Sequence, residues 1–80
     1  MVVRHEDGFY VLGPGDDVRI AGGDGLWRLV VVTAGGREVV LARAMAREVI
    51  QAAYERLLAA AGNYWPVVSL RQYTDLREVE

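Results

Sequence analysis

The sequence contains no cysteine and no lysine, and it has a single histidine among its 80 residues. Without cysteine the chain has no disulfide framework and no thiolate ligands for zinc. No apolar run approaches the roughly 20 residues that span a bilayer, and the first residues lack the long apolar core of a signal peptide. These absences predict a soluble, cytoplasmic protein with no membrane partner.

The residue types that serve catalysis and metal binding are scarce. One serine, Ser69, and two threonines leave no set of nucleophile, base and orienting group. Asp16 and Asp17 are adjacent, so on an extended chain they point to opposite faces and make a poor acid–base pair. His5 precedes two acids, but no second histidine completes a ligand set, and we interpret residues 1–7 as a solvated terminus. The sequence therefore predicts no enzyme activity, no metal, no cofactor and no small-molecule substrate.

Glycine-rich turns divide residues 8–42 into short apolar segments. Asp24-Gly25 is a strong signal for a two-residue hairpin, and Pro14-Gly15 is typical of a turn. The glycines do not form a phosphate loop, because neither a Gly-Lys-Ser/Thr ending nor a following helix is present. We therefore predict four strands, at residues 8–12, 18–21, 26–33 and 37–42.

The first of these segments, residues 8–12, is apolar on both faces. Phe9 and Val11 share one face, and Tyr10 and Leu12 share the other. Such a strand is either covered on both sides or lies at an interface with another molecule.

Residues 43–61 carry the strongest helix signal. The segment is rich in alanine, leucine, glutamate and arginine and contains no glycine or proline. Gly62 follows at the position of a C-terminal glycine cap. Apolar residues recur at helical spacing, which predicts a face packed on the sheet. Tyr54 and Leu58 widen that face, and the alternative is that they contact a second subunit.

Residues 62–80 begin with an aromatic loop that contains Tyr64 and Trp65. Adjacent aromatic side chains either anchor a partner or close the open end of a small sheet. After the loop we favour a short strand at residues 67–70 followed by a terminal helical turn. The alternative is a short helix capped by Ser69.

The run from Pro14 to Ile20, the turn at residues 22–25 and the valine-rich segments 26–32 and 37–41 resemble the meander of SH3-like small barrels with a KOW-like cadence. The resemblance covers about 30 of the 80 residues and implies the fold of these small barrels. The long helix that follows departs from the plain barrel, so we expect an α+β fold in one domain. We expect an antiparallel β-meander at residues 8–42, forming a partly open SH3-like barrel of four to five strands. One long helix at residues 43–61 is expected to cover it, with the loop, strand and turn of residues 62–80 completing the domain.

Three arginines stand nine residues apart on the predicted strands: Arg19, Arg28 and Arg37. If each strand pairs with the next, the three side chains form a row that grips phosphates or carboxylates. The alternative is a solvated face on which neighbouring acids pair with them. The formal net charge of −2 does not favour nucleic acid as the partner.

Two functions follow from these patterns. The first is a small protein-interaction or assembly module, oligomeric or part of a larger complex, because so small a domain has surplus apolar side chains at Tyr10, Leu12, Val30, Val32, Tyr54 and Trp65. The second is a nucleic-acid-binding accessory or regulator that uses the arginine face or a helix-turn-helix variant. The candidate partner-binding residues are Tyr10, Arg19, Arg28, Arg37, Tyr54, Tyr64 and Trp65.

Overall fold

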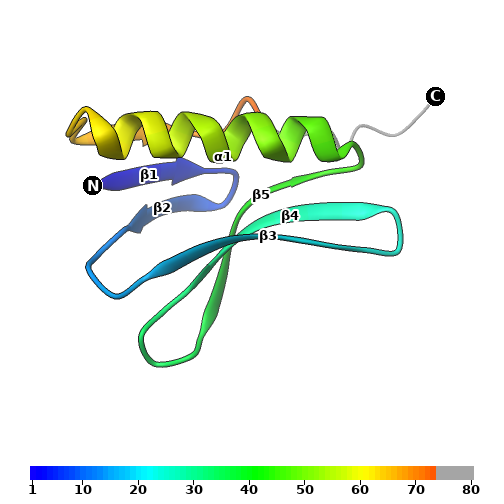
Figure 1. Cartoon of the computed structure of the whole chain (residues 1–80), viewed down its shortest axis with the longest axis horizontal. Coiled ribbons are helices and arrows are strands. Elements are labelled where there is room, and N and C mark those ends of the chain that lie inside the picture. Colours follow the sequence, from blue (N-terminus) through cyan, green and yellow to red (C-terminus); the bar gives the residue numbers. More distant parts are fainter. Residues whose placement is uncertain (74–80) are drawn as a thin grey trace.

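The computed structural model describes residues 1–73 and contains six strands and one helix in the described part (Figure 1). The elements are β1 (Val2–His5), β2 (Gly8–Val11), β3 (Asp17–Gly23), β4 (Leu26–Val32), β5 (Glu38–Ala44), α1 (Arg47–Gly62) and β6 (Val67–Ser69). The α+β class is confirmed. The strand expected to start at residue 67 is present, whereas the expected terminal helical turn falls largely on residues 74–80, outside the described residues.

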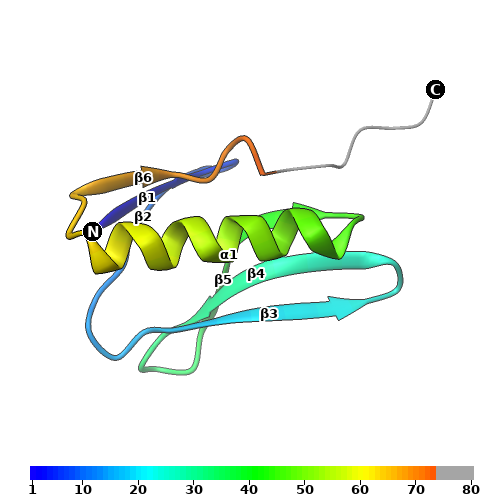
Figure 2. The ribbon, with the colours of Figure 1, turned by 45° about the horizontal axis from the view of Figure 1, so that its top comes forward.

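The strands form two sheets rather than one closed barrel. The first sheet has the order β3-β4-β5 and is antiparallel throughout. The second has the order β2-β1-β6, in which β1 pairs with β2 antiparallel and with β6 parallel. Helix α1 lies between the two sheets (Figure 2). Three of the predicted strands lie together in the first sheet, whereas the first predicted strand, β2, belongs to the other sheet because β1 takes it as a hairpin partner.

The solvated terminus predicted at residues 1–7 is wrong. Residues 2–5 form β1, the central strand of the second sheet, with Val3 fully buried and His5 nearly so. The prediction failed because β1 is only four residues long and its parallel partner β6 lies more than 60 residues away in the sequence. Pairing at that separation leaves no local pattern beyond the two β-branched residues Val2 and Val3.

The hydrophobic core joins the two sheets through α1. The helix buries a narrow stripe of residues at i, i+3, i+7 and i+10: Ile50, Ala53, Leu57 and Ala60. Around it pack Leu29 and Val31 from β4, Leu41 from β5, and Val3, Val68 and Leu70 from the second sheet. Full burial of each large aliphatic side chain contributes about 1.5–3 kcal/mol, so this one cluster supplies most of the stability of a small domain.

The helix is shorter than predicted at its start. Residues 43–46 were expected to be helical, yet β5 continues to Ala44 because Arg43 and Ala44 pair with Arg28 and Trp27 of β4. The helix then begins at Arg47 after Ala46, which makes no side-chain cap hydrogen bond. Strand pairing and the complete burial of Ala44 therefore outweigh the helix propensity of this alanine-rich segment.

The β3–β4 hairpin matches its sequence signal. Asp24 and Gly25 have φ values of 56° and 76°, as a type I′ turn requires. Two positions before the turn, Gly22 lies against the ring of its cross-strand partner Trp27, where a Cβ atom would clash. The Arg47 guanidinium lies 5.5 Å from the centroid of that ring, so the tryptophan links the hairpin to the start of α1.

Two adjacent valines test the register of β6. Val68 is 2% exposed and packs in the core, whereas Val67 is 48% exposed on the other face. We expect Val68→Ala to lower the free energy of unfolding by about 2 kcal/mol, because it removes two buried methyl groups and leaves a cavity. Val67→Ala is expected to change it by less than about 0.5 kcal/mol. Urea denaturation measures both; equal losses would contradict this register.

Candidate functional site

The predicted row of three arginines does not form. Arg19 pairs across the sheet with Val30, and Arg28 pairs with Ala21 on one side and Arg43 on the other. Arg37 lies in the β4–β5 turn, where its carbonyl accepts a hydrogen bond from the Thr33 amide. The equal spacing in the sequence misled because cross-strand partners lie farther apart: the partner of Arg19 is eleven residues on, and the partner of Arg28 on β5 is fifteen residues on.

Acidic neighbours neutralise part of this face, as the alternative interpretation expected. The Arg19 guanidinium donates a hydrogen bond of 2.7 Å to the Asp17 carboxylate. Arg43 forms an ion pair of 3.1 Å with Glu6 from the β1–β2 turn. The outer face of the first sheet is therefore a mixed-charge surface rather than a continuous cationic one.

Tyr10 and Tyr54, two of the candidate binding residues, serve the interior instead. Both are half-buried and pack against the core. The Tyr10 hydroxyl also donates a hydrogen bond of 2.7 Å to Asp16, whose carboxylate accepts a second bond of 2.9 Å from the Gly13 amide. This pair holds the β2–β3 loop, so the role of Tyr10 is to fix that loop in place.

Most of the apolar side chains expected to be in surplus are covered. Tyr10, Leu12 and Tyr54 pack on the core, and Val30 is only 3% exposed. The strand β1, absent from the sequence interpretation, places Val3 beside Tyr10 on the inner face of this sheet, and both side chains pack in or against the core. Trp65 alone of these larger side chains stays substantially exposed, at 37%.

Tyr64 and Trp65 lie together at one end of the molecule, beside an open groove of about 790 Å³. The groove runs between the end of α1, the first residue and the β2–β3 loop. Its lining is almost entirely apolar and includes Met1, Leu12, Pro14, Ala60 and Pro66. The Tyr64 side chain is 91% exposed. An apolar groove beside an exposed aromatic side chain is typical of a binding surface.

The helix end that presents Tyr64 is a Schellman motif. The Trp65 amide donates to the Ala60 carbonyl at 2.9 Å, and the Tyr64 amide donates to the Ala61 carbonyl at 3.3 Å. Tyr64 has φ 57° and so occupies the left-handed position that glycine usually takes. The predicted cap residue, Gly62, is instead the last residue of α1. A side chain in this conformation costs about 1 kcal/mol, which makes a fully exposed tyrosine here notable.

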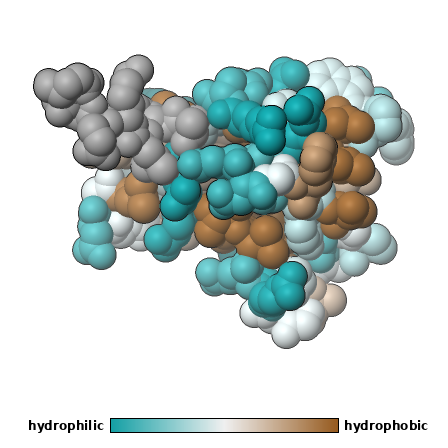
Figure 3. Space-filling model, turned by 180° about the vertical axis from the view of Figure 1, so that it is seen from behind, coloured by the Kyte–Doolittle hydropathy of each residue, from teal (hydrophilic) through white to brown (hydrophobic). Residues whose placement is uncertain are grey.

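The outer face of the second sheet adjoins the groove and is apolar. Val11, Val2 and Val67 form one row across the three strands, and Phe9, Arg4 and Ser69 form the next. Phe9 is 65% exposed and Val11 is 68% exposed. Viewed from behind, hydrophobic surface gathers at the right of the molecule, the end at which the chain begins (Figure 3).

The sequence interpretation missed Phe9, Val11 and Val67 as site residues. The usable signal was the strand at residues 8–12 with two apolar faces, for which an interface was one of two expectations. Only the position of β1 decides which face is covered, and β1 was not predicted. We call the groove, Tyr64, Trp65 and the outer face of the β2-β1-β6 sheet the aromatic end.

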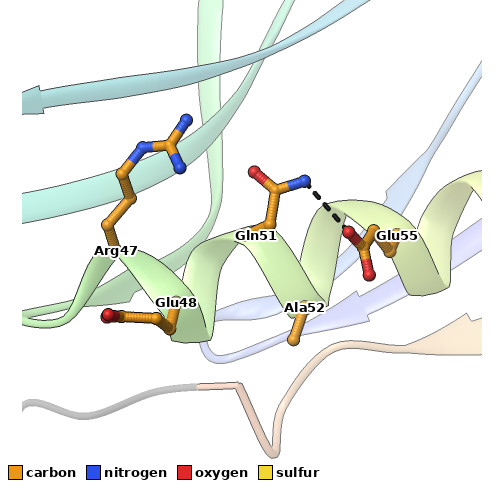
Figure 4. A pocket seen from close by; sticks show the side chains of 5 residues that line it. All are labelled: Arg47, Glu48, Gln51, Ala52 and Glu55. Atoms are coloured by element: carbon orange, nitrogen blue, oxygen red, sulfur yellow. Dashed lines mark hydrogen bonds between the residues drawn. The ribbon is translucent and has the colours of Figure 1, made fainter.

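A second, shallow hollow of about 250 Å³ lies along α1 and is lined by Arg47, Glu48, Gln51, Ala52 and Glu55 (Figure 4). Gln51 donates a hydrogen bond of 3.1 Å to Glu55 within the helix. Arg47 and Gln51 point to one side of the helix, while Glu48 and Ala52 point to another (Figure 4). The charged groups thus do not converge on a common point, and the hollow is a solvated helix surface.

Within residues 1–73, no group of three or more histidine, cysteine or acidic side chains is placed to hold a metal ion. Nor does this part of the chain contain a helix with the length and apolar content needed to cross a membrane. Searches against protein-family models, curated proteins and solved structures found no match. The candidate site therefore stands on geometry alone.

The left-handed Tyr64 leads to a stability prediction. Tyr64→Gly is expected to raise the free energy of unfolding by about 1 kcal/mol, because glycine adopts this conformation without steric penalty. Tyr64→Ala, which keeps a Cβ atom, is the matched control and is expected to give no such gain. Guanidinium denaturation distinguishes the two; equal stability of all three proteins would show that position 64 is unstrained.

The Tyr10–Asp16 pair predicts a pH dependence. The hydrogen bond to Asp16 raises the pKa of Tyr10 above its ordinary value of 10.0. The bond from the Gly13 amide, and then that from Tyr10, lower the pKa of Asp16 below 3.8. The contribution of Asp16 is thus present above pH 3.8 and lost as pH falls through its depressed pKa. That of Tyr10 is present below pH 10.0 and lost as pH rises through its raised pKa.

We therefore expect Tyr10→Phe to destabilise the protein at neutral pH and to do so progressively less in acid as Asp16 becomes protonated. Tyr54→Phe is the control, since the Tyr54 hydroxyl makes no hydrogen bond within the described residues. Thermal unfolding at a series of pH values measures the difference. A loss in Tyr10→Phe that stays constant far below pH 3.8 would contradict this role for Asp16.

Proposed function

We propose that the protein is a small, non-enzymatic protein-interaction or assembly module that contacts its partner through the aromatic end. The observation that carries the proposal is the placement of Phe9, Val11, Val67 and Tyr64 on adjoining exposed surface at one end of the fold. Monomeric domains rarely leave contiguous apolar surface uncovered. Aromatic anchors beside a groove are the usual centre of protein interfaces.

The continuity of the surface supports the same function. The exposed side chains and the groove lie on adjoining surface, and a standard interface takes about 800 Å² from each partner. Either a second copy or another protein would be large enough to cover it. Cytoplasmic location remains part of the proposal, supported by the absence of cysteine.

The nucleic-acid alternative has weaker support. The segment that directly follows α1 is the strand β6 rather than a second helix, which weakens the helix-turn-helix version. The arginine-face version retains the cross-strand neighbours Arg28 and Arg43, although Arg43 pairs with Glu6. The SH3-like resemblance also remains a prediction, supported only by three consecutive antiparallel strands. Steep loss of oligonucleotide binding with added salt would favour this alternative.

Site-specific photocrosslinking tests the proposed function. The full chain carries a photoreactive phenylalanine analogue at position 64, and a control protein carries it at position 24. Asp24 is also exposed and also has a left-handed backbone, but it lies in the β3–β4 turn. After irradiation in the cells that make the protein, we expect a discrete protein adduct from position 64 and none from position 24. Adducts from neither position, with a monomeric mass in solution, would contradict the proposal.

A further inference from the structure

Resting on the proposed function, we infer that the partner of the aromatic end is an acidic protein segment, one that carries carboxylates beside apolar side chains. The carboxylates contact Arg4 on the outer face of the β2-β1-β6 sheet, and the apolar side chains cover the adjoining valines. The inference comes from the arginines at this apolar surface and from the absence of a carboxylate paired with them within residues 1–73.

Arg4 occupies the centre of this face. It stands on the middle strand β1, between Phe9 of β2 and Ser69 of β6. Its guanidinium carbon lies 5.7 Å from the centroid of the Phe9 ring. Its Nε atom is buried without a hydrogen-bond partner. The ring contact and the neighbouring strands therefore hold the guanidinium in place before any partner arrives.

No carboxylate within residues 1–73 pairs with Arg4. Two acids of the neighbouring turns have other partners, since Glu6 pairs with Arg43 and Asp16 accepts hydrogen bonds from Tyr10 and Gly13. A third, Asp7, is exposed in the β1–β2 turn and forms no ion pair with Arg4. A half-buried, oriented guanidinium without a counter-charge favours a planar bidentate acceptor such as a carboxylate.

Two further arginines border the same surface. Arg56 lies 5.3 Å from the centroid of the Trp65 ring and, like Arg4, has a buried Nε atom without a partner. Arg71 donates a hydrogen bond of 3.2 Å to the carbonyl of His5, which fixes its stem beside β1. Neither forms an ion pair within the described residues. Arg56 and Arg71 therefore add positive charge at the border of the apolar surface, whereas the β1–β2 turn adds the acids Glu6 and Asp7.

A second copy of the chain fits this face less well. A two-fold interface must be complementary to itself, yet the outward side chains of the three strands include a cation and no acid: Val2, Arg4, Phe9, Val11, Val67 and Ser69. A nucleic acid also fits poorly, because a phosphate backbone needs a continuous basic track. Here a valine row separates the Arg4 position from the Trp65 end. An acidic and apolar protein segment matches both features.

The test uses the full chain and four probes. Three are short capped peptides that alternate valine or phenylalanine with glutamate, with glutamine or with lysine; the fourth is a single-stranded oligothymidine. Backbone NMR titrations are run at low salt and at 1 M salt, where the Debye length falls to about 3 Å. We expect the glutamate peptide to bind at least tenfold more tightly than the glutamine peptide and to shift the amides of Arg4, Phe9, Val11 and Val67.

Two variants test whether Arg4 causes the preference for the glutamate peptide. Arg4→Gln is expected to remove the tenfold preference for glutamate. Arg4→Lys is expected to keep it only in part, because lysine cannot donate the same bidentate pair of hydrogen bonds to a carboxylate. Arg19→Gln is the control, since Arg19 is exposed on the other sheet and already paired. The preference is expected to survive in that variant. If Arg19→Gln also loses the preference for the glutamate peptide, Arg4 is not its specific cause and the inference is overturned.

The other outcomes are equally decisive. Equal binding of the glutamine peptide at the same residues would overturn the acidic partner and leave the interaction role intact. Tighter binding of oligothymidine at Arg4 would overturn the inference in favour of nucleic acid, as would a stable dimer covering this face in favour of a second copy. If Asp75→Asn with Glu78→Gln and Glu80→Gln tightens the binding of both peptides, the chain's own acidic residues compete for this face, and the inferred separate partner is overturned. No peptide binding overturns the inference, while photocrosslinking still decides the proposed function.

Discussion

The packing of one narrow helix between two small sheets is the constraint on which the structure depends. Ala53 and Ala60 keep the buried stripe of α1 slim, while Ile50 and Leu57 supply the apolar bulk. This arrangement lets a single helix cover one face of each sheet (Figure 2). Within residues 1–73, however, no second helix is present to cover the opposite faces. The first sheet presents charged pairs there, and the second presents valines and a phenylalanine.

That difference between the two outer faces is the basis of the functional account. On β3 and β5, alternation brings Arg19, Asp17 and Glu38 outward, as expected for a solvated face. On β2 and β6, the same alternation brings out Phe9, Val11 and Val67. The chain also places a tyrosine where glycine would relieve the backbone of α1's last turn. Each feature is expected to reduce the solubility or stability of the free protein, which is why we propose that a partner covers this end.

Sequence patterns predicted the local parts of the fold. The Asp24-Gly25 hairpin, the valine-rich β4 and the middle of α1 follow from turn chemistry, periodicity and propensity. The pairing of β1 with β6 could not be predicted from the sequence. The two strands are only four and three residues long, and they lie near opposite ends of the sequence. The candidate site likewise contains one part that the sequence indicates and one part that only the fold reveals. Tyr64 and Trp65 are recognisable in the sequence as an aromatic loop. Arg4 is a candidate binding residue only because β1 places it beside Phe9.

The central claim is that the outer face of the β2-β1-β6 sheet is open in the free protein. Solvent paramagnetic relaxation of methyl groups, measured on the full chain with a soluble gadolinium chelate, tests it directly. The account predicts strong line broadening for the methyls of Val11 and Val67 and little for those of Val3 and Val68, which lie on the same strands or their hydrogen-bonded neighbours but face the core. Protection of Val11 and Val67 equal to that of Val3 and Val68 would contradict the account.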